Sequence, residues 1–77
     1  MKIEILGTGC AKCQQLEELV RGLVAEAGIE AHISKVQDIS KILSYGVLTT
    51  PGLVVNGEVK VAGKIPSAEQ IKGWLKI

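Results

Sequence analysis

The sequence predicts an α/β fold whose elements follow the order strand, helix, strand, helix, strand, strand, helix. Three features of the 77 residues carry this prediction. An apolar run at residues 2–6 and an alternating run at 29–34 flank a long segment of helical periodicity. Asn56-Gly57, between two short apolar runs, is a strong hairpin signal. Ser67-Ala68-Glu69-Gln70 matches the capping box that starts a helix.

The composition is that of one small domain, residues 1–77. Hydrophobic residues make up 47% of the chain, which is adequate for a core, and the formal net charge is +1. The lysines are scattered and the two aromatic residues lie far apart, so we expect no nucleic-acid partner. No apolar run approaches the about 18 residues that span a bilayer, and no signal peptide is visible. We therefore expect a cytoplasmic protein with no membrane association.

The first strand and the first helix are the clearest elements. Glu4 is the odd member of the strand: we expect a solvated or partly covered face, and the alternative is a proton acceptor beneath the cysteines. The helix should begin near Cys10 and end at Gly28, which suits the left-handed conformation of a helix end. Glu17 and Arg21 form an i, i+4 pair opposite its apolar stripe. That stripe consists of Leu16, Leu19, Val20, Leu23, Val24 and Ala27.

The next two elements are shorter. Residues 29–34 alternate as a half-buried strand, which a right-handed crossover should pair in parallel with the first strand. His32 lies on its polar face and is expected at the surface. Asp38 is a suitable N-cap for a short helix, and Tyr45 is expected to pack with its hydroxyl at the surface, although it could border the cysteine site. The apolar face of this helix consists of Ile39, Ile42 and Leu43.

The last third of the chain reads as a hairpin and a helix. Pro51 stands just before a strand at residues 53–55, where a missing N–H is tolerated. The return strand covers 58–62, and the closing helix follows the capping box. The buried face of that helix is expected to consist of Ala68, Ile71, Trp74 and Leu75.

Both cysteines lie in the stretch Gly7-Thr8-Gly9-Cys10-Ala11-Lys12-Cys13, between the first strand and the helix. If the helix begins at about Cys10, its first turn brings both thiols to one side, where they can close a disulfide. The positive end of the helix dipole stabilises a thiolate there. A structural staple explains the pair poorly because so small a loop removes little chain entropy. A structural zinc site needs four ligands, and only His32 is available beyond the thiols.

With Cys10-Ala11-Lys12-Cys13 after the first strand and Thr50-Pro51 before the third, the chain resembles proteins of the thioredoxin fold. Within that fold it resembles the small archaeal and bacterial thioredoxin-like or glutaredoxin-like redox-active disulfide proteins. It implies a four-stranded mixed sheet flanked by three helices, in the order βαβαββα. It also implies that Cys10 is the exposed nucleophile, that Cys13 resolves the mixed disulfide, and that Pro51 follows a cis peptide bond beside them. Thr50 would present its backbone to an extended substrate.

The function implied by the resemblance is that of a thiol–disulfide oxidoreductase of the protein disulfide reductase type. It needs no cofactor and no metal. Its partners would be a disulfide-containing protein substrate and an external thiol or flavoprotein reductase as electron donor, and the chain would act as a monomer. Thioredoxins usually carry Trp-Cys-Gly-Pro-Cys, whereas Gly9 here replaces the Trp and Ala11-Lys12 replaces Gly-Pro. Substrate choice and glutathione use therefore stay open.

Two alternatives remain at this point. Copper carriers of similar length also place a Cys-x-x-Cys loop after a first strand, and two thiolates suit Cu(I). Their element order differs, however, because two strands follow the first helix and the chain ends with a strand. A redox sensor without catalytic activity would use the same disulfide.

Overall fold

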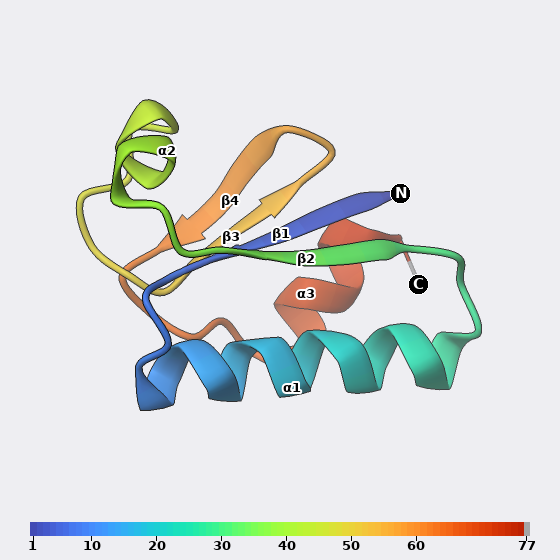
Figure 1. Cartoon of the computed structure of the whole chain (residues 1–77). Coiled ribbons are helices and arrows are strands. Elements are labelled where there is room, and N and C mark those ends of the chain that lie inside the picture. The colour runs from blue at the N-terminus through green and yellow to red at the C-terminus, as the bar shows by residue number, and fades with distance from the viewer. Residues whose placement is uncertain (77) are drawn as a thin grey trace.

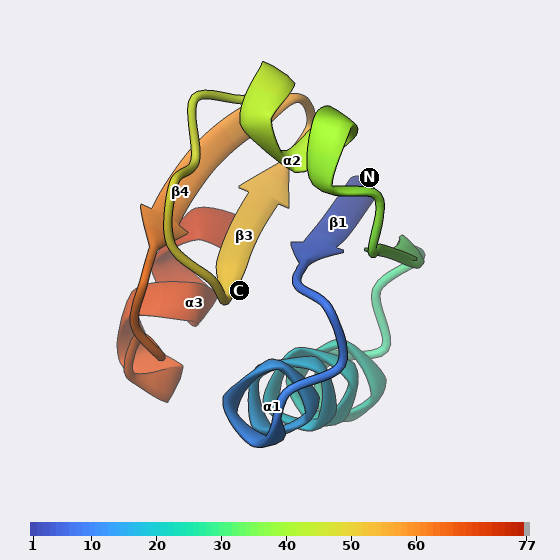
Figure 2. The same cartoon turned by 60° about the vertical axis from the view of Figure 1, so that its left-hand side comes forward.

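The computed structural model describes residues 1–76 and is built around a four-stranded mixed sheet with helices on both faces (Figure 1). Its strands are β1 (Lys2–Leu6), β2 (His32–Val36), β3 (Gly52–Val55) and β4 (Glu58–Ala62), and its helices are α1 (Ala11–Ala27), α2 (Ile39–Ser44) and α3 (Ala68–Leu75). Figure 2 shows α1 and α3 below the sheet and α2 above it. The predicted order βαβαββα is confirmed.

β1 is one of the two central strands of the sheet, whose order is β2-β1-β3-β4. It pairs in parallel with β2, as predicted for the crossover through α1, and antiparallel with β3. The ladder extends to the end of β1, where Leu6 lies opposite Val36 on one side and Gly52 on the other. The next residue continues this anchoring, because the Gly7 N–H donates to the Val36 carbonyl at 2.9 Å. The loop that carries the cysteines therefore begins at the end of a central strand, with a neighbouring strand on each side.

The larger core lies between the sheet and the α1–α3 layer. Ile3 and Ile5 of β1 pack there with Leu53 and Val55 of β3. α1 contributes a buried stripe that confirms the predicted one, although Ala27 at the end of that stripe is exposed. The buried residues of α1 are Cys13, Leu16, Val20, Leu23 and Val24, and those of α3 are Ile71 and Leu75. Cys13 thus belongs to the same stripe as the aliphatic residues that hold α1 to the sheet.

The helix ends and the hairpin follow the local signals. Gly28 ends α1 with φ of 66°, and Asn56 and Gly57 both have positive φ in the tight turn between β3 and β4. Ser67 and Gln70 form the complete capping box of α3. These local features set the end of α1, the turn between β3 and β4 and the start of α3, and the predicted hairpin and capping box are confirmed.

β2 begins and ends later than predicted: it covers His32–Val36, not 29–34. Ile29 and Ala31 do pack against the main core, but they precede the ladder. The strand is defined by its partner, because the register pairs Lys2 with His32 and Leu6 with Val36. Partly buried and exposed side chains already alternate over residues 29–31, before the hydrogen-bonded pairing of β2 begins. Only this alternation can be read from the sequence.

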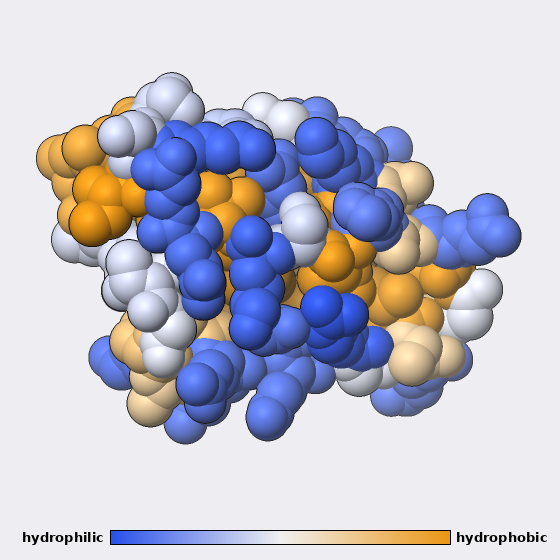
Figure 3. Space-filling view, viewed as in Figure 1, coloured by the Kyte–Doolittle hydropathy of each residue, from blue (hydrophilic) through white to orange (hydrophobic). Residues whose placement is uncertain are grey.

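The predicted apolar face of α2 is wrong for two of its three residues. Ile42 is buried, but Ile39 is 63% and Leu43 is 50% exposed. α2 has six residues and makes less than about two turns, so few of its side chains reach the sheet. Tyr45 and Val47, which follow the helix, complete the packing against Leu6 and Val54. Figure 3 shows the apolar side chains gathered over α2 at the upper left.

Glu4 was expected on a solvated or partly covered face of β1, and the structure instead buries it. It is 2% exposed, on the face of the sheet that α2 covers. The Tyr45 hydroxyl donates to Glu4 Oε1 at 2.6 Å, and Lys41 Nζ lies 3.8 Å from Oε2. The alternative of a proton acceptor beneath the cysteines needs Glu4 to face α1, which covers the opposite face. The hydrogen bond to Glu4, with desolvation, raises the pKa of Tyr45.

No helix within residues 1–76 combines the length and apolar character needed to cross a membrane.

The Tyr45–Glu4 hydrogen bond yields a first prediction. Replacing Tyr45 with Phe leaves a buried carboxylate oxygen without its donor, so the urea midpoint of unfolding should fall at neutral pH. Because folding raises the pKa of Tyr45, the bond contributes fully below the ordinary tyrosine value of about 10. Its contribution is lost as pH rises through the raised pKa, so the difference between the two proteins should shrink there. Ser44→Ala, which removes an exposed hydroxyl one residue away, should change the midpoint little. Equal midpoints for wild type and Tyr45→Phe at neutral pH would contradict this account of Glu4.

Candidate active site

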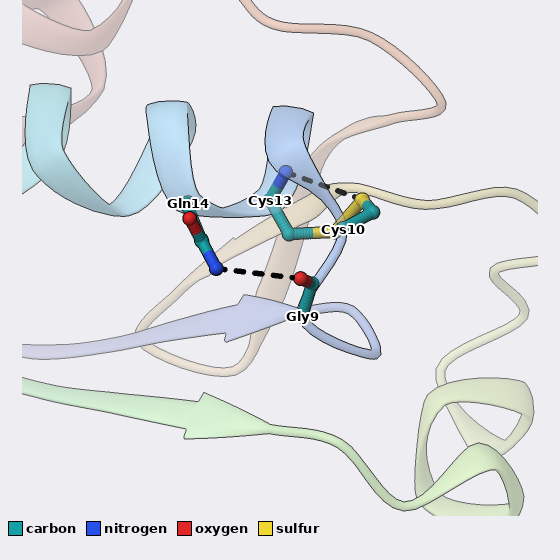
Figure 4. The surroundings of a disulfide bond; sticks show 4 residues. All are labelled: Gly9, Cys10, Cys13 and Gln14. Atoms are coloured by element: carbon teal, nitrogen blue, oxygen red, sulfur yellow. Dashed lines mark hydrogen bonds between the residues drawn. A yellow bond between two sulfur atoms is a disulfide. The ribbon is translucent and has the colours of Figure 1, made fainter.

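The two cysteines lie at the start of α1, where the loop from β1 meets the helix (Figure 4). Cys10 is the N-cap residue, with an extended backbone, and its Sγ accepts a hydrogen bond from the Cys13 N–H at 3.3 Å. Its carbonyl accepts from the Gln14 N–H at 3.0 Å. A cysteine sulfur therefore takes the place of the hydroxyl or carboxylate oxygen that commonly caps a helix. This sulfur lies at the positive end of the helix dipole.

Cys10 and Cys13 form a disulfide, and their Cα atoms are 5.1 Å apart. This separation lies within the about 4.4–6.8 Å that disulfides normally span. The two residues differ sharply in access to solvent. Cys10 is exposed, whereas Cys13 is 5% exposed because it belongs to the buried stripe of α1. A partner molecule can thus reach one sulfur of the pair from solvent much more easily than the other.

Gly7 makes room for the disulfide at the end of β1. A Cβ at this position would overlap Cys13 Sγ and would lie 3.9 Å from the Thr50 Cβ. Gly7, Cys13 and Thr50 therefore meet at one point, and the glycine permits the first turn of α1 to approach the strand closely. Sequence reasoning treated Gly7 only as part of a glycine-containing loop. A glycine placed directly after a strand was the available signal for this close approach.

The segment before β3 packs against the same point. The Thr50–Pro51 peptide bond is cis, as the resemblance implies, and Pro51 is buried while Thr50 is half-buried. The Pro51 carbonyl accepts from the Gly63 N–H at 2.8 Å. Gly63 has φ of +81°, and a Cβ there would overlap Thr49 Oγ1. The chain after β4 thus fixes this segment from one side, while Gly7 contacts it from the other.

Three charged side chains of α1 and β2 form a cluster, and two of them, Glu17 and Lys35, line the same small cavity as Cys13. Arg21 Nε lies 2.8 Å from Glu17 Oε2, which confirms the predicted pair, and Lys35 Nζ of β2 lies 3.5 Å from Glu17 Oε1. The Glu17 side chain is only 15% exposed, so it lies at the edge of the buried stripe and not opposite it. The hydrogen bond from Arg21 and the charges of both cations lower the pKa of Glu17. Lys35 was missed because the predicted strand ended one residue before it.

The other residues considered from sequence lie elsewhere. His32 is exposed, as expected, at the start of β2. Tyr45 bonds to Glu4 on the α2 side, and the expected surface hydroxyl is therefore partly buried. Trp74 is half-buried against the main core. Within residues 1–76, no group of three or more His, Cys, Asp and Glu side chains could hold a metal ion.

Known proteins match this sequence over nearly the whole chain. The family model described as "Thioredoxin domain" matches residues 1–76. The chain belongs to the thioredoxin family. It is 49% identical over 72 residues to a protein named "Thioredoxin" from Methanothermobacter thermautotrophicus, covering 94% of each chain. It is 47% identical over 74 residues to a protein of the same name from Methanocaldococcus jannaschii, covering 96% of this chain and 85% of that one.

As a thioredoxin-family thiol–disulfide oxidoreductase, the chain carries its redox pair at Cys10 and Cys13. The element order also separates it from the copper carriers considered above. In those proteins two strands follow the first helix directly, whereas α2 lies between β2 and β3 here.

The close approach at Gly7 yields a second prediction. Gly7→Ala places a methyl group on Cys13 Sγ and should lower the stability of the oxidised protein by about 1–3 kcal/mol, the usual cost of overpacking. The matched control is Gly22→Ala in the middle of α1, where a Cβ meets nothing within 4 Å. Because glycine is a poor helix former, that change should stabilise the protein by about 0.5–1 kcal/mol. Urea unfolding of both variants measures the difference, and equal effects of the two alanines would show that Gly7 is not needed for the approach.

Proposed function

We propose that this protein is a protein disulfide reductase in which Cys10 attacks the partner disulfide and Cys13 resolves the mixed disulfide. The observation that carries the proposal is the unequal access to the two sulfurs. Cys10 is exposed at the N-terminus of α1, whereas Cys13 is 5% exposed. A bulky protein disulfide can approach the exposed sulfur of Cys10, whereas Cys13 is shielded because it belongs to the buried stripe of α1.

Position also favours Cys10 as the thiolate. Its Sγ accepts the Cys13 N–H, a backbone donor of the first helical turn that has no carbonyl partner within the helix. This donor and the helix dipole both stabilise negative charge on that sulfur. The thiolate is the form that attacks disulfides, so the N-cap position provides the nucleophile.

The reaction then has two displacements. The Cys10 thiolate attacks one sulfur of the partner disulfide, forms a mixed disulfide and releases the other partner sulfur as a thiolate. Cys13 loses its proton to water and attacks Cys10 Sγ, which forms the Cys10–Cys13 bond and releases the second partner thiolate. The two electrons that reduce the partner come from the Cys10 and Cys13 thiols. An external thiol or a flavoprotein reductase must reduce the pair again.

Thr50 and Pro51 are the proposed docking residues for the substrate. Thr50 lies beside Gly7 and Cys13, two residues before the start of β3, and is partly accessible. An extended segment of the partner can add its backbone to that of Thr50 as a further strand, which holds its disulfide near Cys10. Pro51 is buried behind Thr50, and its carbonyl is held by Gly63. This support gives the docking residue a defined position.

Trapping of the mixed disulfide tests the assignment of the two cysteines. Cys13→Ser retains the nucleophile without the resolving thiol, so it should accumulate a covalent complex with insulin that a reducing agent releases. Cys10→Ser should form little or none, because the remaining thiol is buried. The wild type should reduce insulin and retain no complex. Mass spectrometry identifies the joined cysteines, and trapping through Cys13 in place of Cys10 would reverse the assignment.

A further inference from the structure

Three segments of the chain frame the redox pair, and Figure 1 shows them together at one end of the molecule. They are the loop after β1 with the first turn of α1 (residues 7–14), the segment before β3 (residues 46–51) and the chain after β4 (residues 62–67). The contacts at Gly7 and Gly63 described above hold these segments to one another. A partner that reaches the exposed Cys10 sulfur therefore meets a surface built from all three, which we call the redox face.

The redox face carries positive charge without matching negative charge. Its charged side chains are those of Lys12 and Lys64, and its three segments contain no Asp or Glu. Both lysines are exposed, and neither forms an ion pair with any of residues 1–76. Other cations of the chain do pair with carboxylates, namely Arg21, Lys35, Lys41 and Lys60. The two lysines without a carboxylate partner thus lie where a partner protein has to bind.

The neighbouring carboxylates do not neutralise this face. α1 has no acidic residue in its first turn, where such residues would offset the positive end of the helix dipole. Glu18 lies beyond that turn, and Glu17 is already paired with Arg21 and Lys35. Glu69 belongs to the first turn of α3, where it faces the dipole of that helix instead. The redox face therefore attracts anionic groups.

We propose that the redox face selects its protein substrates by charge: Lys12 and Lys64 bind acidic side chains of the segment that carries the partner disulfide. The inference rests on the proposed function, because it takes Cys10 as the point of attack. Opposite charges across such a surface attract the partner before contact and favour the correct docking orientation. The lysines determine specificity, and the thiol–disulfide exchange itself proceeds as described above.

The two lysines come from opposite sides of the segment that contains Thr50. Lys12 lies on α1, whose first turn meets this segment beside Gly7. Lys64 follows Gly63, which contacts the same segment from the chain after β4. An extended substrate that pairs with the Thr50 backbone therefore has a cation on each side. The occupant that fits is a protein segment with acidic residues on both sides of its disulfide cysteine.

The test compares the reduction of three synthetic peptide disulfides by the reduced full-length protein. The peptides share one sequence and differ only in carrying glutamate, glutamine or lysine beside their cysteines. Each exposed ion pair changes an equilibrium by about 1.5- to 5-fold. With two lysines, the second-order rate constant should be about two- to twenty-fold higher for the glutamate peptide than for the glutamine peptide. The lysine peptide should react more slowly than either, and high salt should reduce the differences.

Substitution of the lysines identifies their contribution through the ratio of the glutamate to the glutamine rate constants. Lys64→Gln should lower this ratio by about 1.5- to 5-fold, and Lys64→Arg, which keeps the charge, should retain it. Lys12→Gln should lower the ratio by a similar factor. Lys12 lies between the two cysteines, so any effect on the reactivity of Cys10 changes both rate constants and cancels in the ratio.

The matched control is Lys72→Gln. Lys72 is also an exposed lysine, but it lies on α3 and lines a pocket with Leu23 and Ala27 of α1. Leu23 is about 20 Å along the helix from Cys10, which is about two Debye lengths at 0.1 M salt. The Lys72→Gln protein should therefore keep the wild-type ratio.

Equal rate constants for the glutamate and glutamine peptides with the wild type would overturn the proposal. So would an unchanged ratio in Lys64→Gln, or the same loss in Lys72→Gln. Reduction of all three peptides at one rate would defeat the selection by charge and leave the proposed function intact. If the wild type reduced none of them, the proposed function would fail, and this inference with it.

Discussion

The close approach of the first turn of α1 to the end of β1 is the constraint on which the site depends. Gly7 permits it, because any side chain there would occupy the position of Cys13 Sγ. With this contact in place, the buried stripe of α1 carries Cys13 into the interior, and the cap position leaves Cys10 outside. The same point receives Thr50 from the segment before β3. The chemical difference between two identical side chains thus follows from ordinary helix packing.

Much of this arrangement could be predicted from the sequence because its signals are local. Helical periodicity, the capping residues and Asn56-Gly57 each depend on neighbours along the chain, and they placed α1, α3 and the hairpin correctly. The errors concern contacts between distant segments. The limits of β2 depend on its partner strand. The exposure of Ile39 depends on how α2 packs on the sheet, and the burial of Glu4 depends on its contact with Tyr45. Lys35 lies one residue beyond the predicted strand, so its ion pair with Glu17 of α1 could not be placed from the sequence.

The two faces of the sheet separate the charged groups into independent clusters. On the α2 side, Glu4 is buried and bonded within a local network, so its role is in packing this small helix. On the α1 side, Glu17 and Lys35 lie beside the redox pair. Ion pairs of this kind contribute little to stability when they are partly exposed, about 0–1 kcal/mol.

The most direct test of the central claim is a redox titration of Cys10 and Cys13 against mixtures of reduced and oxidised glutathione, followed by mass analysis of the alkylated protein. If the Gly7 contact holds the two sulfurs as one redox pair, both thiols should disappear together in a single two-electron transition. The oxidised product should be the intramolecular disulfide. Accumulation of a glutathione adduct on Cys10 with Cys13 still reduced, or failure to form the disulfide at all, would contradict the account.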